Sequence, residues 1–240
     1  MSLKDDLKNG VNDFFSGDYD IIQGKVVPDV ADIEFGKTGK ELDLAMLFID
    51  IRRSTKIVDA FRRKTSARMY KSFLYGVSKI SRNNNGYVRS FNGDGVLVVF
   101  IGDTKRTNAV KTAMQLSWFC QEVLKPKLDQ YFKDNSQLTD TEFDFGIGID
   151  IGKVLVVRGG IRGSNNNDLV WIGNATNYAV KLSDLSKDGY HIYISEDVYD
   201  YMNKSTKYGG NIQENMWEAR TWNAMNGQTI YRSNWTWGIN

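Results

Sequence analysis

The sequence predicts an α+β sandwich in which helices pack on a largely antiparallel β-sheet. Short segments with alternating or continuous apolar residues indicate strands, whereas longer segments with apolar residues three and four positions apart indicate helices. These segments follow one another in the order β-α-β-β-α-β and then α-β. That succession is typical of a ferredoxin-like arrangement, with helices flanking one sheet.

The length and composition fit one domain with short appendages. The chain has 240 residues, of which 41% are hydrophobic, enough for one sizeable core and too few for two large domains. We expect an N-terminal appendage at residues 1–40, which are polar with a weak helical pattern. The main domain should occupy residues 41–204, and the aromatic-rich residues 205–240 should close the same domain.

The first strong signals are a strand and a helix. Residues 42–51 form a continuous apolar run interrupted only by Asp43 and Asp50, which predicts a central strand buried on both faces. Residues 54–82 have apolar positions at helical spacing, and the Asn-Asn-Asn-Gly sequence at 83–86 should end that helix.

A hairpin should follow. Residues 87–91 and 96–100 have the apolar pattern of strands, and Asn92-Gly93-Asp94-Gly95 between them has the composition of a tight turn. This pattern places Asp94 at the tip of the hairpin.

The next third of the chain predicts a helix, a strand and a loop. Residues 107–131 read as a long amphipathic helix broken near Pro126. Residues 143–157 alternate as a strand, and their glycines allow close backbone approach. Residues 159–167, rich in glycine and asparagine, should form a loop.

The last third should complete the sheet. We expect a helix at 174–185, a strand at 190–195 and a helix at 196–202. The remaining segment is rich in tryptophan and should form a closing hairpin.

Composition excludes several classes of function. The chain has 31 Lys and Arg against 29 Asp and Glu, which gives no broad basic surface for nucleic acid. Its apolar runs are too short to cross a bilayer and its N-terminus lacks the apolar core of a signal peptide, so we expect a cytoplasmic protein without membrane contact. With one cysteine, Cys120, and one histidine, His191, in a strand-like run, a His/Cys zinc site or a Ser-His-Asp triad has almost nothing to be built from. Carboxylates and phosphate-binding groups must carry any chemistry.

Two aspartates stand at predicted strand ends. Asp50 ends the central strand, and Asp94 lies in the hairpin turn. Each has an ordinary interpretation taken alone, Asp50 as the N-cap of the next helix and Asp94 as a turn residue beside glycine. If strand and hairpin are neighbours, the two carboxylates converge and form a site for two hard divalent cations.

Such a pair of ions suits phosphoryl chemistry. One ion would lower the pKa of a ribose 3′-hydroxyl for attack on an α-phosphate, and the other would hold the triphosphate and the pyrophosphate leaving group. The segment after Asp50 turns from strand into helix and would offer backbone N–H groups to the phosphates. The candidate phosphate-binding residues are Arg52, Arg53, Ser54 and Thr55.

Four motifs resemble, in order and spacing, the class III nucleotidyl cyclases. They are Phe48-Ile49-Asp50-Ile51, Gly93-Asp94-Gly95, Phe145-Gly146-Ile147-Gly148-Ile149 with Gly152, and Ile172-Gly173 followed by Asn177. A lone Gly-Asp-Gly is a weak signal, but four motifs in register make coincidence improbable. The resemblance covers roughly residues 42–200 and implies the class III cyclase version of the ferredoxin-like sandwich.

The resemblance implies roles for particular residues. In that family two aspartates and the main-chain carbonyl after the first hold two Mn²⁺ or Mg²⁺ ions, which corresponds to Asp50, Ile51 and Asp94. An asparagine that orients the ribose corresponds to Asn177. Four residues later the family usually has an arginine that stabilises the transition state. This chain has Lys181 there, which keeps the charge but not the bidentate geometry.

The family also implies a partner. Its active sites combine metal-binding residues of one subunit with transition-state residues of the other in a head-to-tail dimer. This chain has one copy of each set, so the resemblance implies a homodimer with two equivalent shared sites and an inactive monomer.

The positions that read the base depart from the purine enzymes. Family adenylyl cyclases use a lysine with an aspartate or threonine, and guanylyl cyclases a glutamate with a cysteine or similar residue. By register those positions are Ser90 and Val170 here, or Arg89 and Trp171 if the register slips by one. Neither purine pair is present, and valine can neither donate nor accept a hydrogen bond.

This departure, with the short build and no sensory domain, resembles the pyrimidine cyclases of bacterial Pycsar antiphage systems. Those enzymes make cUMP or cCMP, which activates a separately encoded effector protein. By this analogy we expect UTP as the favoured nucleoside triphosphate and 3′,5′-cyclic UMP as the product. The positions to test for uracil recognition are Ser90, Val170 and Arg52.

Alternatives remain open at this point. One is a cytidylate cyclase, and another is an adenylyl cyclase with unusual base contacts. A third is a binding module without turnover, which Lys181 favours and the retained Asp50, Asp94 and Asn177 oppose. A fourth, a polymerase-type palm such as a diguanylate cyclase, would need a GGDEF-like hairpin, whereas this turn is Asn-Gly-Asp-Gly.

Overall fold

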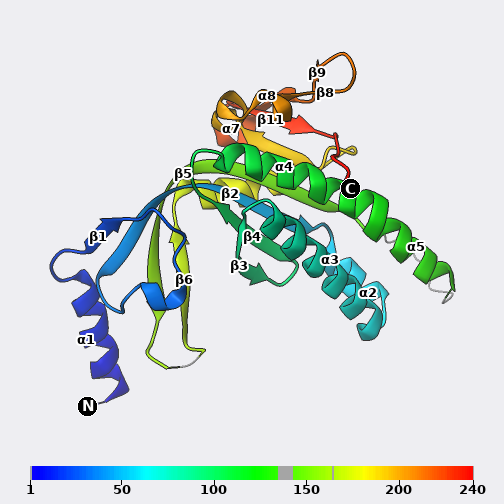
Figure 1. Cartoon of the computed structure of the whole chain (residues 1–240). Helices are drawn as coiled ribbons and strands as arrows, with labels where there is room; N and C mark the ends of the chain where they lie inside the picture. Colours follow the sequence, from blue (N-terminus) through cyan, green and yellow to red (C-terminus); the bar gives the residue numbers. More distant parts are fainter. Residues whose placement is uncertain (1, 135–142, 164, 240) are drawn as a thin grey trace.

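The computed structural model describes residues 2–134, 143–163 and 165–239. A single large sheet organises the molecule (Figure 1). Its strand order is β10-β11-β7-β5-β2-β4-β3, with β1 added beside β2 and β6 beside β5. The strands are β1 (Asp20–Gln23), β2 (Thr38–Ile51), β3 (Tyr87–Asn92), β4 (Gly95–Phe100), β5 (Phe145–Gly160), β6 (Asn167–Ile172), β7 (Ile192–Ser195), β10 (Glu218–Trp222) and β11 (Gln228–Ser233). A small separate sheet pairs β8 (Tyr208–Gly209) with β9 (Glu214–Asn215).

Most of the large sheet is antiparallel. The long pair β2–β5 runs in register from Lys40↔Val156 to Ile51↔Phe145 and forms its centre. Only β1 with β2 and β5 with β7 pair in parallel among the described strands. The predicted α+β sandwich on a largely antiparallel sheet is confirmed.

The chain also forms α-helices, most of which flank this sheet, whereas the first of them has no buried residue and extends away from it (Figure 1). They are α1 (Leu3–Phe15), α2 (Ser54–Ala60), α3 (Arg63–Asn83), α4 (Lys105–Trp118), α5 (Lys125–Asp134), α6 (Asn174–Ser183), α7 (Glu196–Tyr201) and α8 (Lys204–Lys207). Short helical turns occur at Val30–Asp32 and Asn223–Met225, and a π-helix at Phe119–Leu124 joins α4 to α5.

The side chains of β2 point alternately to the two faces of the sheet and so divide the core into two clusters. Its odd-numbered residues, such as Leu47 and Ile49, pack with the side chains of α3 and α4. Its even-numbered residues, such as Met46 and Phe48, face the side on which α6 contributes Ala179. Asp50 is also even-numbered, so it lies at the end of the strand on the α6 side.

Two predicted helices have different limits. The helix predicted at 54–82 is divided, because Phe61 is extended (φ −113°, ψ 154°) between α2 and α3. This turn buries the Phe61 ring, which stacks on Phe132 of α5 with ring centroids 4.3 Å apart. Pro126 does not break the second helix. The π turn before it, with the Lys125 N–H bonded to the Cys120 carbonyl, absorbs the change in backbone and the helical path continues into α5.

The predicted loop at 159–167 is shorter, and a strand was missed. β5 continues to Gly160, which pairs with Asn167, the first residue of β6. Gly160 has φ +101°, and an added Cβ would meet the Asn166 backbone, so glycine is required at this tight turn. The β6 sequence escaped prediction because half-exposed and exposed positions alternate along it without a buried face.

Candidate active site

The structure brings Asp50 and Asp94 together. β2 pairs with β4 as far as Ile49↔Val96, and the turn before β4 places Asp94 at the end of β2. The two carboxyl groups are within hydrogen-bonding reach of each other. Burial and the charge of Asp94 raise the pKa of Asp50 from 3.8 to about 6, with Arg52 acting in the opposite direction.

Glycines shape this turn. Gly93 has φ +66°, which the turn requires and which a side chain would strain. Gly95 lies directly under the Phe48 ring, where a Cβ would clash. The Gly-Asp-Gly motif therefore fits Asp94 closely against the end of β2.

Tyr70 also belongs to this group of side chains, and the sequence did not indicate it. Burial and the charge of Asp94 raise its pKa, while a hydrogen bond with Ser54 lowers it; Asp50 acts to raise it further. Tyr70 is therefore near both the carboxyl pair and Ser54, the first residue of α2. Tyr70 lies on α3 among residues with helical periodicity, and that pattern gives no sign of a site.

The candidate phosphate-binding residues are not all free to face the carboxyl pair. Arg52 donates from Nη1 to Asp184 Oδ1 at 2.6 Å and from Nη2 to the Asp184 carbonyl at 3.2 Å. Arg53 adopts the left-handed conformation (φ 56°) as the N-cap of α2 and lines a cavity of about 500 Å³ with Asp144 and His191. Ser54 and Thr55 begin α2.

The other half of the candidate site lies on α6. Gly146 and Gly148 of β5 allow this helix to lie directly on the sheet, because a Cβ at either position would strike the helix backbone. Asn177 and Lys181 are both exposed and one helical turn apart on α6. The Lys181 ammonium lies 3.7 Å from the Met225 sulfur.

The two positions predicted to read the base lie on opposite sides of the central β2–β5 pair. Ser90 is on β3, where its hydroxyl donates to Asn92 Oδ1 at 2.8 Å. Val170 is on β6 and is 46% exposed. Of the neighbouring positions, Arg89 pairs with Asp29 at 2.7 Å and Trp171 packs partly buried against the core on the α6 side.

The donor set suits hard divalent cations. Among the described residues no group of three or more His, Cys, Asp and Glu side chains could hold a metal ion. The neighbouring carboxyl groups of Asp50 and Asp94 match the one or two carboxylates with which proteins bind Mg²⁺ when substrate phosphates complete its coordination. The Ile51 carbonyl stays a predicted third ligand. Burial and the charge of Asp94 together outweigh the opposing charge of Arg52, so the pKa of Asp50 stays raised.

Comparison with known proteins decides the family. The model of the adenylate and guanylate cyclase catalytic domain matches residues 38–223. The chain belongs to this family. It is a class III nucleotidyl cyclase, a lyase, and the resemblance of its four motifs is confirmed.

Relatives support the family assignment by sequence, and solved structures support the fold. A uridylate cyclase of Xanthomonas perforans is 37% identical over 100% of both chains. One of Burkholderia cepacia is 34% identical, also over 100% of both. The adenylyl cyclase CyaB from P. aeruginosa has a TM-score of 0.65 at 21% identity, over 81% of this chain and 95% of that one, which shows the shared fold.

None of the described helices of this cyclase is both long and apolar enough to cross a bilayer.

Proposed function

We propose that the protein is a pyrimidine nucleotide cyclase that converts UTP into 3′,5′-cyclic UMP and pyrophosphate. The main support is the identity of 33–37% over at least 97% of each chain with three relatives named uridylate cyclase. The absence of both purine-reading pairs at Ser90 and Val170 points in the same direction. The 3′-oxygen attacks the α-phosphorus, the bond from that phosphorus to the bridging oxygen breaks, and pyrophosphate leaves.

Asp50, Asp94 and the Ile51 carbonyl would hold the two divalent ions, Mn²⁺ or Mg²⁺. When bound, such ions supply charge that favours the ionised 3′-hydroxyl and stabilises the leaving pyrophosphate. Asp50 and Asp94 meet at one strand end, and their shared negative charge fits a cation site better than a structural carboxyl pair. Ser54 and Thr55 at the start of α2 would contact phosphate oxygens beside them.

Asn177 and Lys181 would act on the substrate from the other subunit. Asn177 would orient the ribose, and Lys181 would balance the negative charge that develops on the transferring phosphate. Lys181 is exposed and contacts a thioether, so its charge is available to a ligand. The proposed assembly is therefore a homodimer with two shared active sites.

The base would be read by Ser90 and Val170, with Arg52 as a third candidate. The Ser90 hydroxyl can serve as donor and acceptor, as uracil recognition requires. The apolar surface of Val170 is exposed and can contact the flat face of a pyrimidine. Arg52 would need to leave Asp184 to reach a base.

The proposed wider role rests on the resemblance of the sequence to the pyrimidine cyclases of Pycsar systems. We propose that cyclic UMP made in the cytoplasm acts as a second messenger in defence against phage and activates an effector protein encoded separately. Cytidylate cyclase, then adenylate cyclase with unusual base contacts, then a binding module without turnover are the alternatives.

The test compares cyclic UMP production from UTP and Mn²⁺ by the wild-type protein with that by Asp50→Ala and Asp94→Ala. Each variant should retain its fold and dimerise but lose activity by roughly a thousandfold or more, because the metal ligands support the reacting oxygens directly. Turnover that survives both substitutions would contradict the proposed site. Absence of cyclic product from the folded wild-type dimer would favour the binding-module alternative.

A further inference from the structure

The end of β2, which carries the metal-binding residues, depends on β5 for its position. β4 pairs with β2 only as far as Ile49, so Asp50 and Ile51 are held within the sheet by their pairing with β5. Beyond the strand, the Arg52 N–H donates to the Asp144 carbonyl at 2.9 Å. The position of the predicted metal ligands therefore depends on the position of the first residues of β5.

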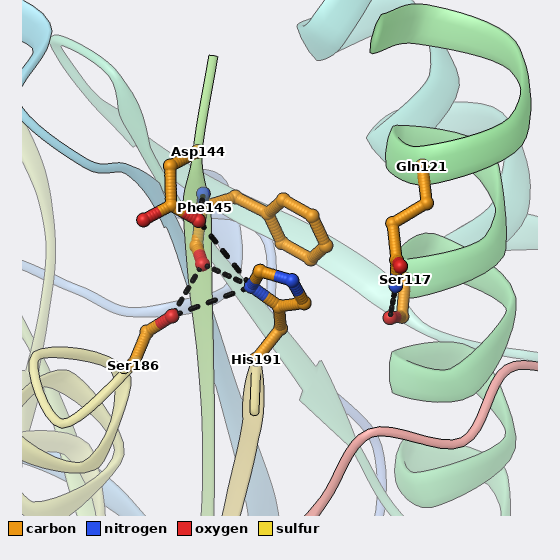
Figure 2. Close-up of polar contacts among 6 residues, drawn as sticks. All are labelled: Ser117, Gln121, Asp144, Phe145, Ser186 and His191. Atoms are coloured by element: carbon orange, nitrogen blue, oxygen red, sulfur yellow. Dashed lines mark hydrogen bonds and ion pairs between the residues drawn. The ribbon is translucent and has the colours of Figure 1, made fainter. Parts of the chain in front are cut away.

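The start of β5 is anchored by the connection between α6 and β7 (Figure 2). The Ser186 hydroxyl donates to the Phe145 carbonyl at 2.8 Å, and His191 Nδ1 lies 3.1 Å from the same oxygen. Asp144 Oδ1 lies 3.4 Å from His191 Nδ1 and accepts from the Phe145 N–H at 2.8 Å. The Ser186 Oγ also lies 3.4 Å from Nδ1, but it donates its hydrogen to the Phe145 carbonyl. Because the Phe145 and Asp144 oxygens can only accept, Nδ1 carries the hydrogen.

The His191 ring is held in place by more than these polar contacts. It stacks on the Phe145 ring with centroids 4.3 Å apart and an interplanar angle of 17°. The pKa of Asp144 is lowered: burial acts to raise it, but the hydrogen bonds from His191 and the Phe145 N–H outweigh burial. An ionised Asp144 thus holds the imidazole against the start of β5.

A second contact joins the end of α6 to Arg52, the residue directly after β2. The Arg52 guanidinium, only 26% exposed, binds both the carboxylate and the carbonyl of Asp184. Asp184 is the C-cap of α6. The residue that follows the metal ligands is therefore fixed to the helix that carries Asn177 and Lys181.

We propose that Asp184, Ser186 and His191, here called the α6–β7 brace, are positioning residues that hold the metal-binding end of β2 in register with α6 of the same subunit. Asp184 contacts Arg52, and Ser186 and His191 contact the start of β5, so the brace acts on the metal ligands through these neighbours. The inference deepens the proposed function and rests on its shared-site dimer. In that dimer the brace joins the metal half of one active site to the transition-state half of the other.

The experiment uses dimers with a single competent site. One subunit carries Asp50→Ala and a first affinity tag, the other Lys181→Ala and a second tag, and sequential purification yields the heterodimer. Its one working site takes metal ligands from the Lys181→Ala subunit and α6 from the Asp50→Ala subunit. Asp184→Asn is then placed in either subunit, and the Mn²⁺ concentration for half-maximal activity is measured together with kcat.

In the metal-donating subunit, Asp184→Asn should raise the Mn²⁺ concentration for half-maximal activity about tenfold or more, as loss of groups that orient metal ligands does. In the α6-donating subunit it should lower kcat and leave that Mn²⁺ concentration unchanged. Asp184→Glu should restore most of the Mn²⁺ response. Asp188→Asn, at a carboxylate whose side chain is 70% exposed, is the matched control and should change neither quantity.

An unchanged Mn²⁺ response with Asp184→Asn in the metal-donating subunit would overturn the brace. If Asp184→Asn fails to fold, Ser186→Ala replaces it with the same expected result. Failure of the shared-site dimer has a different signature, because the heterodimer without a brace substitution would then be inactive. In that case the Mn²⁺ response of a homodimer with Asp184→Asn alone still decides whether the brace positions the metal ligands.

Discussion

At the scale of single residues, the site is defined by two carboxyl groups placed in contact. Burial of the Asp50 carboxyl group, and next the negative charge of Asp94, raise the pKa of Asp50 to about 6. This arrangement costs stability in the metal-free protein and is suited to a bound cation, which would remove the cost.

The cost can be measured with Asp50→Asn in the presence of EDTA. A raised pKa means that the folded state binds the Asp50 proton more tightly than the unfolded state does. The contribution of protonated Asp50 to folding stability is therefore fully present below the ordinary pKa of 3.8 and is lost as pH rises through about 6. At pH 8 the variant should therefore be more stable than wild type by about 1–2 kcal/mol, after allowance for partial exposure. Thermal unfolding should show a gain of a few °C at pH 8 that disappears at pH 4.

Asp20→Asn is the control, because Asp20 is an exposed carboxylate on β1. It should show no comparable gain. A lower melting temperature for Asp50→Asn at pH 8 in EDTA would contradict the strained carboxyl pair.

Lys181 should act in the transition state. Lys181→Ala should reduce kcat by about a hundredfold or more with little change in KM, because its charge is used only as the phosphate becomes more negative. Lys181→Arg should keep most activity. Lys187→Ala, which removes an exposed lysine beyond the end of α6, should leave kcat unchanged. An equal loss in Lys181→Ala and Lys187→Ala would show that general surface charge is responsible.

At the scale of elements, the relation between α6 and β5 matters most. Gly146 and Gly148 let the helix backbone touch the strand, which sets the height of Asn177 and Lys181 above the sheet. The strand sequence thus determines where residues of a different element can meet a substrate.

Gly148→Ala and Gly152→Ala form a matched pair that tests this contact. A Cβ at Gly148 would collide with the Ala179 carbonyl. A Cβ at Gly152 would lie 3.5 Å from the Ala175 Cβ on the same helix, which is an ordinary van der Waals distance. Gly148→Ala should lower stability by about 1–3 kcal/mol and reduce cyclase activity, since α6 must move. Gly152→Ala should be close to wild type in both unfolding and turnover. Similar effects of the two would contradict direct packing of α6 on β5.

The sequence predicted elements with strong local patterns and missed those that depend on distant contacts. The apolar run of β2 and the hairpin turn at Asp94 are local signals, and the structure confirms both. β6 lacks a buried face, and the division of the helix at Phe61 depends on stacking with Phe132, so neither had a local signal. For the site, the motifs identified Asp50 and Asp94, but the pairing of Arg52 with Asp184 joins residues 132 positions apart and could not be read from periodicity.

At the scale of the whole molecule, one sheet positions both halves of the proposed active site. The carboxyl pair lies at the end of β2, and α6 packs on the face of β5 with Asn177 and Lys181 exposed. In the proposed head-to-tail dimer, each subunit therefore contributes a different half to each of two sites.

Sharing of sites predicts that activity depends on concentration. Specific activity at saturating UTP and Mn²⁺ should fall on dilution in parallel with the fraction of dimer measured by light scattering or mass photometry. Constant specific activity while the dimer dissociates would show that one subunit is sufficient.

The most direct test of the central claim is product analysis after incubation with equimolar ATP, GTP, CTP and UTP and Mn²⁺. We expect cyclic UMP to dominate and to disappear with Asp50→Ala and with Asp94→Ala. A dominant cyclic AMP or cyclic GMP peak, lost in the same variants, would keep the carboxyl site and contradict the assignment of a pyrimidine substrate.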